Sequence, residues 1–428
     1  MGSDPNFKNL ADLKFKILTL GCKVNQYDSQ EIRERFLEAG WREAAKGQQA
    51  SVYIINTCTV TQKADRDSLY YIRRSFRENP SALIVVTGCL TELDSKQLKK
   101  EQGVGLIIKN RDKGKIVSRV INRNSARSGI SFFEGRTRAF LKIQDGCNNF
   151  CSYCKVPLVR GVSRSKPLSE VMREARQLVA SGYCEIVLTG ICLGSYGKDL
   201  KPGSSLVTVI DSLEAVEGLH RIRLSSIEAK DVSDQLIGQI ARSKKLCRHL
   251  HIPIQSGDNE ILRSMHRKYT GRDYLRLVQE LKKACPGIAI TTDVLAGYPG
   301  EEERHFRNTM DLVKKIMPLR THIFPFSPRE GTQAFVLKNQ VAADIVKDRV
   351  DRMRHAAEIC AAAYRKKFLS KIMPVLIETR VKGSNNMWEG HTDNYLKVRC
   401  RSSRDLRNKL IPLRLEKIGG GEISGILP

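Results

Sequence analysis

The stretch that decides the predicted fold and chemistry is Asp145-Gly146-Cys147-Asn148-Asn149-Phe150-Cys151-Ser152-Tyr153-Cys154. Its cysteines follow the spacing C-x3-C-x2-C, and three thiolates on one short loop can hold three irons of a [4Fe–4S] cluster while the fourth stays open to a cofactor. The alternative is a structural zinc site, which normally has four protein ligands in a closed tetrahedron. The next cysteine along the chain is Cys184, and no histidine lies close to the loop. The spacing therefore favours an iron–sulfur cluster with an open iron.

Length and charge limit the classes of protein that fit. A chain of 428 residues is long for one hydrophobic core and indicates two or three domains. The formal net charge of +27, from 73 Lys+Arg against 46 Asp+Glu, favours a polyanionic partner such as nucleic acid over a generally basic protein surface.

The cysteine content points to a compartment. Twelve cysteines in a chain of this length, without a signal peptide, indicate a reducing, cytoplasmic compartment in which cysteines are thiols or metal ligands. Residues 1–11 are interpreted as a tag or disordered start. No apolar run approaches the roughly 18 residues of a membrane span, so no membrane partner is expected.

Three strand-and-helix units are expected before residue 121, with strands at 14–22, 52–58 and 83–89. Each unit has one cysteine just beyond its strand. The loops that follow parallel strands gather along one edge of the sheet. Three thiols should therefore converge there: Cys22, Cys58 and Cys89. Three unrelated buried cysteines are the alternative, since free cysteine is often buried. The repeated position favours a second iron–sulfur site with three protein ligands.

The remaining patterns divide the chain further. The predicted organisation is an N-terminal parallel α/β domain at 12–121, a linker at 122–134, a central domain at 135–367 and a small all-β domain at 368–428. Six strands of the central domain are expected at 139–144, 185–190, 220–227, 249–255, 288–296 and 319–326. Strands separated by helices in this number predict a partial (βα)6 barrel, with the cysteine loop after the first strand at the mouth where such folds place their chemistry.

Polar and glycine residues follow the other barrel strands. Together they can line one pocket for a polar cofactor, although each alone is also an ordinary turn signal. The candidates are Gly190, Ser226, Glu228, Gln255, Ser256 and Asp293.

The last domain carries a basic stripe. The two-residue period of a strand would place Tyr395, Lys397, Arg399 and Arg401 on one face. Cations beside an aromatic ring suit RNA phosphates and stacked bases. The alternative is a strand edge protected by charged residues.

These motifs together resemble the methylthiotransferase family of radical S-adenosylmethionine (SAM) enzymes over nearly the whole chain, most closely the branch often called MtaB. The matching segments are 19–26, 56–60, 87–89, 147–154, 157–161, 186–190, 251–257 and 297–301, and the C-terminal match, to an RNA-binding TRAM domain, rests on 389–395. Tyr153, just before the third cysteine, is an aromatic residue that the family usually has there and joins the cofactor candidates. Lys155 departs from the family pattern, which usually has an apolar residue at this position.

The resemblance implies a fold, cofactors and a reaction. Cys147, Cys151 and Cys154 would hold a [4Fe–4S] cluster that binds SAM, in a radical SAM barrel, and a second [4Fe–4S] cluster would carry sulfur. One electron would cleave SAM, and the resulting radical would remove hydrogen from an aromatic carbon that general-base chemistry cannot deprotonate. The expected reaction inserts a methylthio group at C2 of N6-threonylcarbamoyladenosine (t6A) beside the tRNA anticodon. The expected partners are tRNA and an electron donor such as flavodoxin or ferredoxin.

Three alternatives remain open at this point. Two of them keep the family's reaction but change the substrate, to isopentenyladenosine in tRNA or to an aspartate of a ribosomal protein. Outside the family's chemistry, the chain is a non-catalytic iron–sulfur protein that binds RNA and senses redox state.

Overall fold

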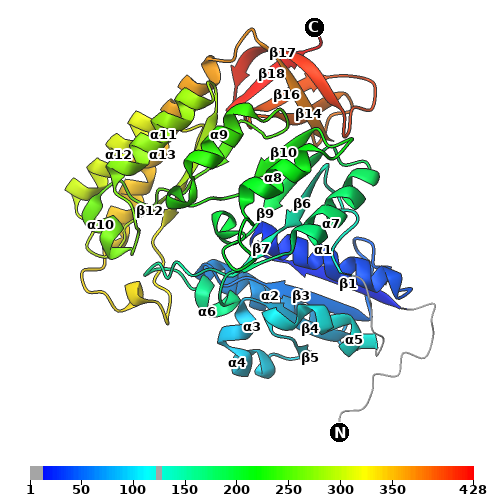
Figure 1. The fold of residues 1–428 in the computed structure, drawn as a ribbon. Helices are drawn as coiled ribbons and strands as arrows, with labels where there is room; N and C mark the ends of the chain where they lie inside the picture. The colour runs from blue at the N-terminus through cyan, green and yellow to red at the C-terminus, as the bar shows by residue number, and fades with distance from the viewer. Residues whose placement is uncertain (1–12, 122–127) are drawn as a thin grey trace. The chain divides into compact units, whose positions relative to one another are not determined.

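The computed structural model describes residues 13–121 and 128–428 (Figure 1). These form two compact units, which are described separately. The first unit holds the chain up to residue 132 together with 146–148 and 154–162, and the second holds 133–145, 149–153 and 163–428. The expected start at 1–11 and residues 122–127 of the expected linker lie outside the described residues. The domain boundaries drawn from the sequence remain predictions.

The first unit is built on a parallel five-stranded sheet of order β2-β1-β3-β4-β5. Its strands are β1 (Lys14–Thr19), β2 (Arg42–Glu43), β3 (Val52–Thr57), β4 (Leu83–Gly88) and β5 (Val104–Ile107). Its helices are α1 (Lys23–Glu38), α2 (Gln62–Glu78), α3 (Leu90–Leu93), α4 (Ser95–Lys100), α5 (Ile116–Ile121) and α6 (Val156–Arg160), with a 3₁₀ turn η2 (Asn110–Lys115).

Helices cover both faces of this sheet, as its sequence requires. β3 is buried along its whole length, which is typical of central strands in parallel sheets. Alternate residues of β3 enter two different cores. Ile54 packs with Phe36 of α1 and Val117 of α5, whereas Ile55 packs with Ile72 of α2. The predicted parallel α/β fold is confirmed for this unit.

Residues 128–132, in the expected linker, lie within the first unit. The Glu34 carboxylate accepts hydrogen bonds from the backbone N–H of Ser131, at 2.9 and 3.0 Å, and of Phe132, at 3.1 Å. Glu34 is itself buried, so these bonds compensate its desolvation.

The second unit contains the predicted six parallel strands. They are β6 (Arg138–Lys142), β9 (Glu185–Thr189), β10 (Arg221–Leu224), β11 (His249–His251), β12 (Ala289–Ala296) and β13 (Arg320–Pro325). They form two three-stranded sheets of order β10-β9-β6 and β11-β12-β13. Single bridges, Ile222 with Leu246 and Ser226 with His251, join the sheets beside β10. Among the described residues β6 and β13 are not paired, so the barrel is open, as predicted.

Helices and short elements complete this barrel. The helices are α7 (Leu168–Ala180), α8 (Leu206–Glu214), α9 (Asp234–Arg242), α10 (Asn259–Ser264), α11 (Gly271–Ala284), α12 (Glu303–Ile316) and α13 (Ala343–Lys366). The short elements are β7 (Gln144–Asp145), β8 (Arg164–Ser165) and the 3₁₀ turns η3 (Leu193–Ser195), η4 (Ala229–Asp231) and η5 (Gln333–Phe335). No helix in the described part of the chain has the length and apolar character needed to cross a membrane.

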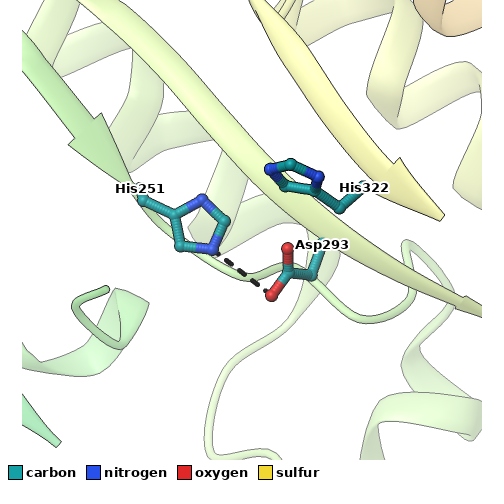
Figure 2. A group of neighbouring side chains, drawn as sticks. All are labelled: His251, Asp293 and His322. Carbon is teal, nitrogen blue, oxygen red and sulfur yellow. Dashed lines mark ion pairs between the residues drawn. The ribbon is translucent and has the colours of Figure 1, made fainter. Parts of the chain in front are cut away.

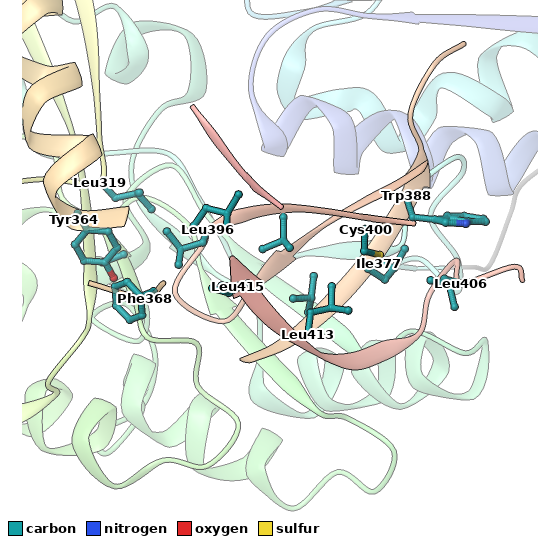
Figure 3. Packing of buried hydrophobic residues seen from close by; sticks show 14 residues of the cluster. Leu319, Tyr364, Phe368, Ile377, Trp388, Leu396, Cys400, Leu406, Leu413 and Leu415 are labelled. Atoms are coloured by element: carbon teal, nitrogen blue, oxygen red, sulfur yellow. The ribbon is translucent and has the colours of Figure 1, made fainter. Parts of the chain in front are cut away.

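The chain ends in a closed five-stranded barrel of order β14-β15-β16-β18-β17. Its strands are β14 (Ile372–Arg380), β15 (Met387–Thr392), β16 (Lys397–Arg401), β17 (Leu410–Gly419) and β18 (Glu422–Ile426). This confirms the predicted small all-β, TRAM-like domain. Its core includes Trp388, which is fully buried, and continues into Tyr364 of α13 and Phe368 just after that helix (Figure 3).

A buried ionic network also connects the two barrels of the second unit. Glu185 on β9 accepts a 2.7 Å hydrogen bond from Arg223 Nε on β10. Arg223 Nη1 in turn donates to the carbonyl of Asp393, at 2.9 Å, beyond β15. Burial alone would raise the pKa of Glu185, but Arg223 and two further arginines lower it to about 2. The network stays fully ionised and ties the first residues of the barrel strands to the C-terminal domain.

Candidate functional site

Three thiols lie at one edge of the N-terminal sheet, as the strand-end rule predicts. β1, β3 and β4 are adjacent and parallel, so their carboxyl ends meet there. Cys22 precedes α1 and is exposed, whereas Cys58 and Cys89, which follow β3 and β4, are buried. A Cβ on Gly21 would lie 2.7 Å from Cys58 Sγ, so only glycine leaves room for this thiol.

Two buried cations face these thiols, and the sequence analysis missed both. Lys113 Nζ lies 2.8 Å and Arg160 Nη2 lies 3.7 Å from Asp28 Oδ2. Burial raises the pKa of Cys58 to about 11 and raises that of Cys89, whereas the positive charge of Arg160 lowers both. Burial lowers the pKa of Lys113, so the positive charge that favours the metal-binding thiolate forms is chiefly that of Arg160.

Helix α6 supplies one of these cations and is fixed beside Cys89. Arg160 is its last residue and donates a hydrogen bond to the Cys89 sulfur. Asn110 Nδ2 donates both to the Val159 carbonyl, at 3.1 Å, and to Cys89 Sγ, at 3.7 Å. The short segment just after the cysteine loop is therefore part of the N-terminal thiol site.

Two cysteines of the loop belong to the first unit and are tied to the same segment. Cys147 N–H donates to the carbonyl of Gly161 at 3.0 Å, and Cys154 Sγ accepts from Val156 N–H at 3.4 Å. Both cysteines are partly buried. A backbone N–H aimed at a cysteine sulfur stabilises the thiolate that a cluster requires.

The remaining loop cysteine, Cys151, belongs to the second unit and faces a buried guanidinium. Arg267 Nη1 lies 3.5 Å from Cys151 Sγ and 3.1 Å from Glu228 Oε1. Glu228 was predicted to contact a cofactor, and Arg267 fixes its carboxylate beside the cysteine. The cleft at this point is lined by Asn149, Cys151, Glu228, Lys230, His266, Arg267, Lys268 and Tyr269.

Four other predicted cofactor residues have identifiable structural positions. Gly190 and Gln255 occupy special backbone positions, because a Cβ on Gly190 would lie 2.8 Å from Gln144 Oε1 and Gln255 has φ of +64°. Ser226 forms a bridge with His251. Tyr153 packs beside a small buried cluster that contains Tyr298.

The side chain of Ser256 is buried, with its hydroxyl 3.2 Å from Thr309 Oγ1 and accepting from Asp258 N–H at 3.2 Å. These bonds hold the loop after β11 against α12. A contact of Ser256 with the cofactor remains a prediction.

Asp293 lies with two histidines that the sequence analysis did not assign. Figure 2 shows its carboxylate between His251 of β11 and His322 of β13, with His251 Nε2 3.3 Å from Asp293 Oδ2. His251 Nδ1 lies 2.9 Å from Thr291 Oγ1, which orients the ring. Nitrogen and oxygen atoms of these three side chains lie within 4.8 Å of one another. The three strands thus present one polar group, in which His322 lies in register opposite Asp293.

Comparisons with known proteins identify the family to which this chain belongs. Residues 14–109 match the model described as "Uncharacterized protein family UPF0004", and residues 141–313 match the radical SAM superfamily. The threonylcarbamoyladenosine tRNA methylthiotransferase MtaB of Bacillus subtilis is 39% identical over 94% of this chain and 93% of its own. This chain belongs to the radical SAM tRNA methylthiotransferase family. The enzyme thus uses SAM and a [4Fe–4S] cluster.

Two further relatives and one solved structure add detail. MtaB of Thermotoga maritima is 37% identical over 89% of this chain and 90% of its own. The tRNA-2-methylthio-N6-dimethylallyladenosine synthase of Clostridium novyi is 35% identical over 99% of this chain and 98% of its own. The fold is similar to that of the radical SAM methyltransferase TsrM from Kitasatospora setae, with a TM-score of 0.57 at 13% identity, covering 76% of this chain and 74% of TsrM.

The cysteine loop fits the family's cluster. It offers three thiols and no fourth protein ligand within its own sequence. A guanidinium and a backbone N–H face two of the sulfurs. This donor set suits a cluster whose fourth iron is left for SAM, and assignment of the three cysteines as its ligands remains a prediction.

Tyr395, which was predicted to belong to the RNA-binding face of the C-terminal domain, packs against other side chains of the second unit. Tyr395 precedes β16 in a left-handed conformation, with φ of +68°. Its ring stacks on His249 and His391, with centroids 4.6 and 4.9 Å apart, and Arg223 lies over it. Tyr395 therefore packs against the ionic network between the barrels, and its ring lies on His391, which pairs with Lys397 across the sheet.

The three cations differ among themselves. Lys397 Nζ lies 2.9 Å from both Glu389 and Glu422, and Arg399 Nε lies 2.6 Å from Glu422. Arg401, at the end of β16, is exposed. RNA binding by these residues remains a prediction, and Arg401 offers it the most accessible charge.

Proposed function

We propose that this enzyme converts t6A beside the tRNA anticodon into its 2-methylthio derivative. The observation that carries the substrate assignment is the 39% identity to the B. subtilis MtaB over 94% of the chain. The dimethylallyladenosine synthase of C. novyi, at 35%, is the nearest rival among the relatives compared. That relative makes isopentenyl-type adenosine in tRNA the second candidate substrate.

We further propose a second [4Fe–4S] cluster on Cys22, Cys58 and Cys89. The support is the convergence of three strand-end thiols next to Lys113 and Arg160. Cys58 and Cys89 are buried, whereas Cys22 is exposed, so the group is open on one side. A cluster bound there would have protein ligands on three sides and an accessible position for sulfur.

The chain's own residues would divide the work as follows. When bound, SAM and its cluster supply the radical that an unreactive aromatic C–H bond requires. Arg267 holds Glu228 and the Cys151 sulfur in fixed positions. Arg160 and Lys113 keep positive charge beside the N-terminal thiols. An electron donor of the flavodoxin or ferredoxin class would supply the reducing electron.

The test is a substrate comparison. Anticodon stem-loop RNAs carrying t6A, isopentenyladenosine or plain adenosine are incubated with the anaerobically reconstituted enzyme, SAM, sulfide and dithionite. Mass spectrometry of the nucleosides should find the 2-methylthio product from the t6A RNA alone. Faster conversion of the isopentenyladenosine RNA would move the enzyme to the second candidate function.

A further inference from the structure

Phe150, between the first two cysteines of the loop, has an unfavourable conformation. Its φ is +47°, in the left-handed region that bulky residues rarely adopt. Its side chain is nevertheless 61% exposed, and it joins no ring pair or buried cluster in the described part of the chain. Packing does not offset the strain, and strained residues that persist are concentrated at functional sites.

The backbone around Phe150 is anchored on both sides. The Phe150 carbonyl lies 3.4 Å from His266 Nδ1, and Ser152 N–H donates to the Met265 carbonyl at 3.3 Å. Ser152 Oγ lies 2.8 Å from Tyr298 OH. The exposed ring is therefore presented by a fixed segment of the second unit.

Two lysines give the adjoining cleft a positive charge. Lys230 and Lys268 line it together with the neighbours of Phe150, Asn149 and Cys151. Both lysines are exposed. Lys230 Nζ donates to Asn149 Oδ1 at 2.6 Å, and neither lysine has a carboxylate partner among the described residues. Their charges are available to an anionic partner.

We propose that Phe150 is a stacking platform for an unpaired nucleotide of the RNA substrate, with Lys230 and Lys268 facing its phosphates. The proposal rests on the proposed function for the presence of tRNA. An exposed aromatic ring beside uncompensated cations is the chemistry by which proteins bind single-stranded nucleotides. Placement next to Cys151 would bring the stacked nucleotide to the cluster loop, which explains why the strained conformation is retained.

The test uses the enzyme with its clusters reconstituted and an anticodon stem-loop in which 2-aminopurine replaces the target adenosine. Stacking quenches 2-aminopurine fluorescence. Phe150→Gly removes the ring and accepts the positive φ, Phe150→Trp keeps an aromatic face, and Phe335→Ala removes another exposed phenylalanine, 44% accessible, as the matched control.

The ring deletion should weaken RNA binding about 10-fold and abolish the quenching. Phe150→Trp and Phe335→Ala should keep both, and iron content and SAM affinity should match the wild type throughout. Replacing both lysines with Gln should lower the slope of log affinity against log salt by about 1.4. If Phe150→Gly loses iron, Phe150→Leu takes its place in the same comparison.

Two results would overturn the proposal: unchanged RNA affinity and quenching in the ring deletion, or a loss of SAM affinity that matches the loss of RNA affinity, which would assign the ring to SAM. Product analysis of the wild-type enzyme on t6A RNA is scored separately. A failure there would remove the proposed substrate without deciding the role of Phe150.

Discussion

The two groups of three cysteines are assembled in opposite ways. Cys147, Cys151 and Cys154 come from one loop of the sequence, and their partners include a backbone carbonyl, the guanidinium of Arg267 and a backbone N–H, respectively. Cys22, Cys58 and Cys89 come from three strand ends, and the sheet itself brings them together. The loop depends on local geometry, whereas the N-terminal group depends on the integrity of a whole domain.

This difference has a chemical counterpart. Two of the N-terminal thiols, Cys58 and Cys89, are buried. Burial raises their pKa values, and the positive charge of Arg160 lowers them. The three loop cysteines are all partly buried. Under the proposed assignment, the N-terminal cluster would be held by two buried thiols and one exposed thiol, and the loop cluster by three partly buried ones.

The largest expected effects are on enzyme activity, and they should differ between the two groups of cysteines. Cys154→Ala should abolish both SAM cleavage and methylthio transfer, because two thiolates do not hold the open cluster in place. The triple replacement of Cys22, Cys58 and Cys89 with Ala should keep SAM cleavage but give no methylthio product. Formation of 5′-deoxyadenosine and of modified nucleoside is measured side by side with dithionite. Normal methylthio transfer by the triple variant would refute the division of labour.

Iron content sharpens the same comparison. The reconstituted wild-type protein should contain two [4Fe–4S] clusters, and replacing either complete group of three cysteines should leave about half of the iron. Iron is measured by mass spectrometry on samples that circular dichroism shows to be folded. A wild-type protein with one cluster would remove the N-terminal site.

A smaller effect should come from Arg160, which follows the cysteine loop in sequence but donates a hydrogen bond to Cys89 of the N-terminal group. Arg160→Met removes charged hydrogen bonds to Cys89 and Asn25, and should lower the free energy of unfolding of the N-terminal unit by about 1.5–3 kcal/mol. It should also shift the EPR signal or potential of the N-terminal cluster.

Arg160→Lys should recover part of both effects, because it restores the charge. Arg111→Met is the control, since that side chain is 68% exposed. Equal stability and identical spectra for Arg160→Met and the control would show that the guanidinium does not support this site.

The smallest effect should leave both groups of cysteines untouched. Arg401→Glu should weaken RNA binding and lower its salt slope by about 1, as expected for one lost phosphate contact. Lys397→Gln, whose cation is already paired with Glu389 and Glu422, should change the slope less. Equal effects of the two substitutions would mean that those ion pairs open when RNA binds.

Local and periodic signals predicted most of the fold. The six thiols, the parallel N-terminal sheet, the open barrel and the C-terminal β domain follow from strand periodicity and from cysteines repeated at strand ends. The polar group that His251 and His322 form with Asp293 was missed. Residues that neighbouring barrel strands bring together show no regular spacing along the chain.

Long-range placement could not be predicted in the same way. The segment 154–162 joins the first unit through contacts of Arg160 and Asn110, which lie far apart in sequence. The stacking of Tyr395 on His249 could not be predicted, because the two residues lie far apart in the sequence. The buried position of the Ser256 hydroxyl could not be predicted, because a hydroxyl in a glycine-rich turn looks the same whether it points toward a cofactor or into the protein.

The shared core of the second unit has a consequence for how this protein melts. Tyr364 and Phe368 lie in one apolar cluster with Trp388, and Arg223 bonds the carbonyls that follow β15. The C-terminal β-barrel is therefore thermodynamically coupled to the radical SAM barrel, and the two should unfold in one cooperative transition. Deleting residues 370–428 would uncover apolar side chains at the end of α13 and remove carbonyl acceptors of the buried Arg221 and Arg223. A shortened protein that fails to bind RNA would therefore report lost folding rather than a lost RNA contact.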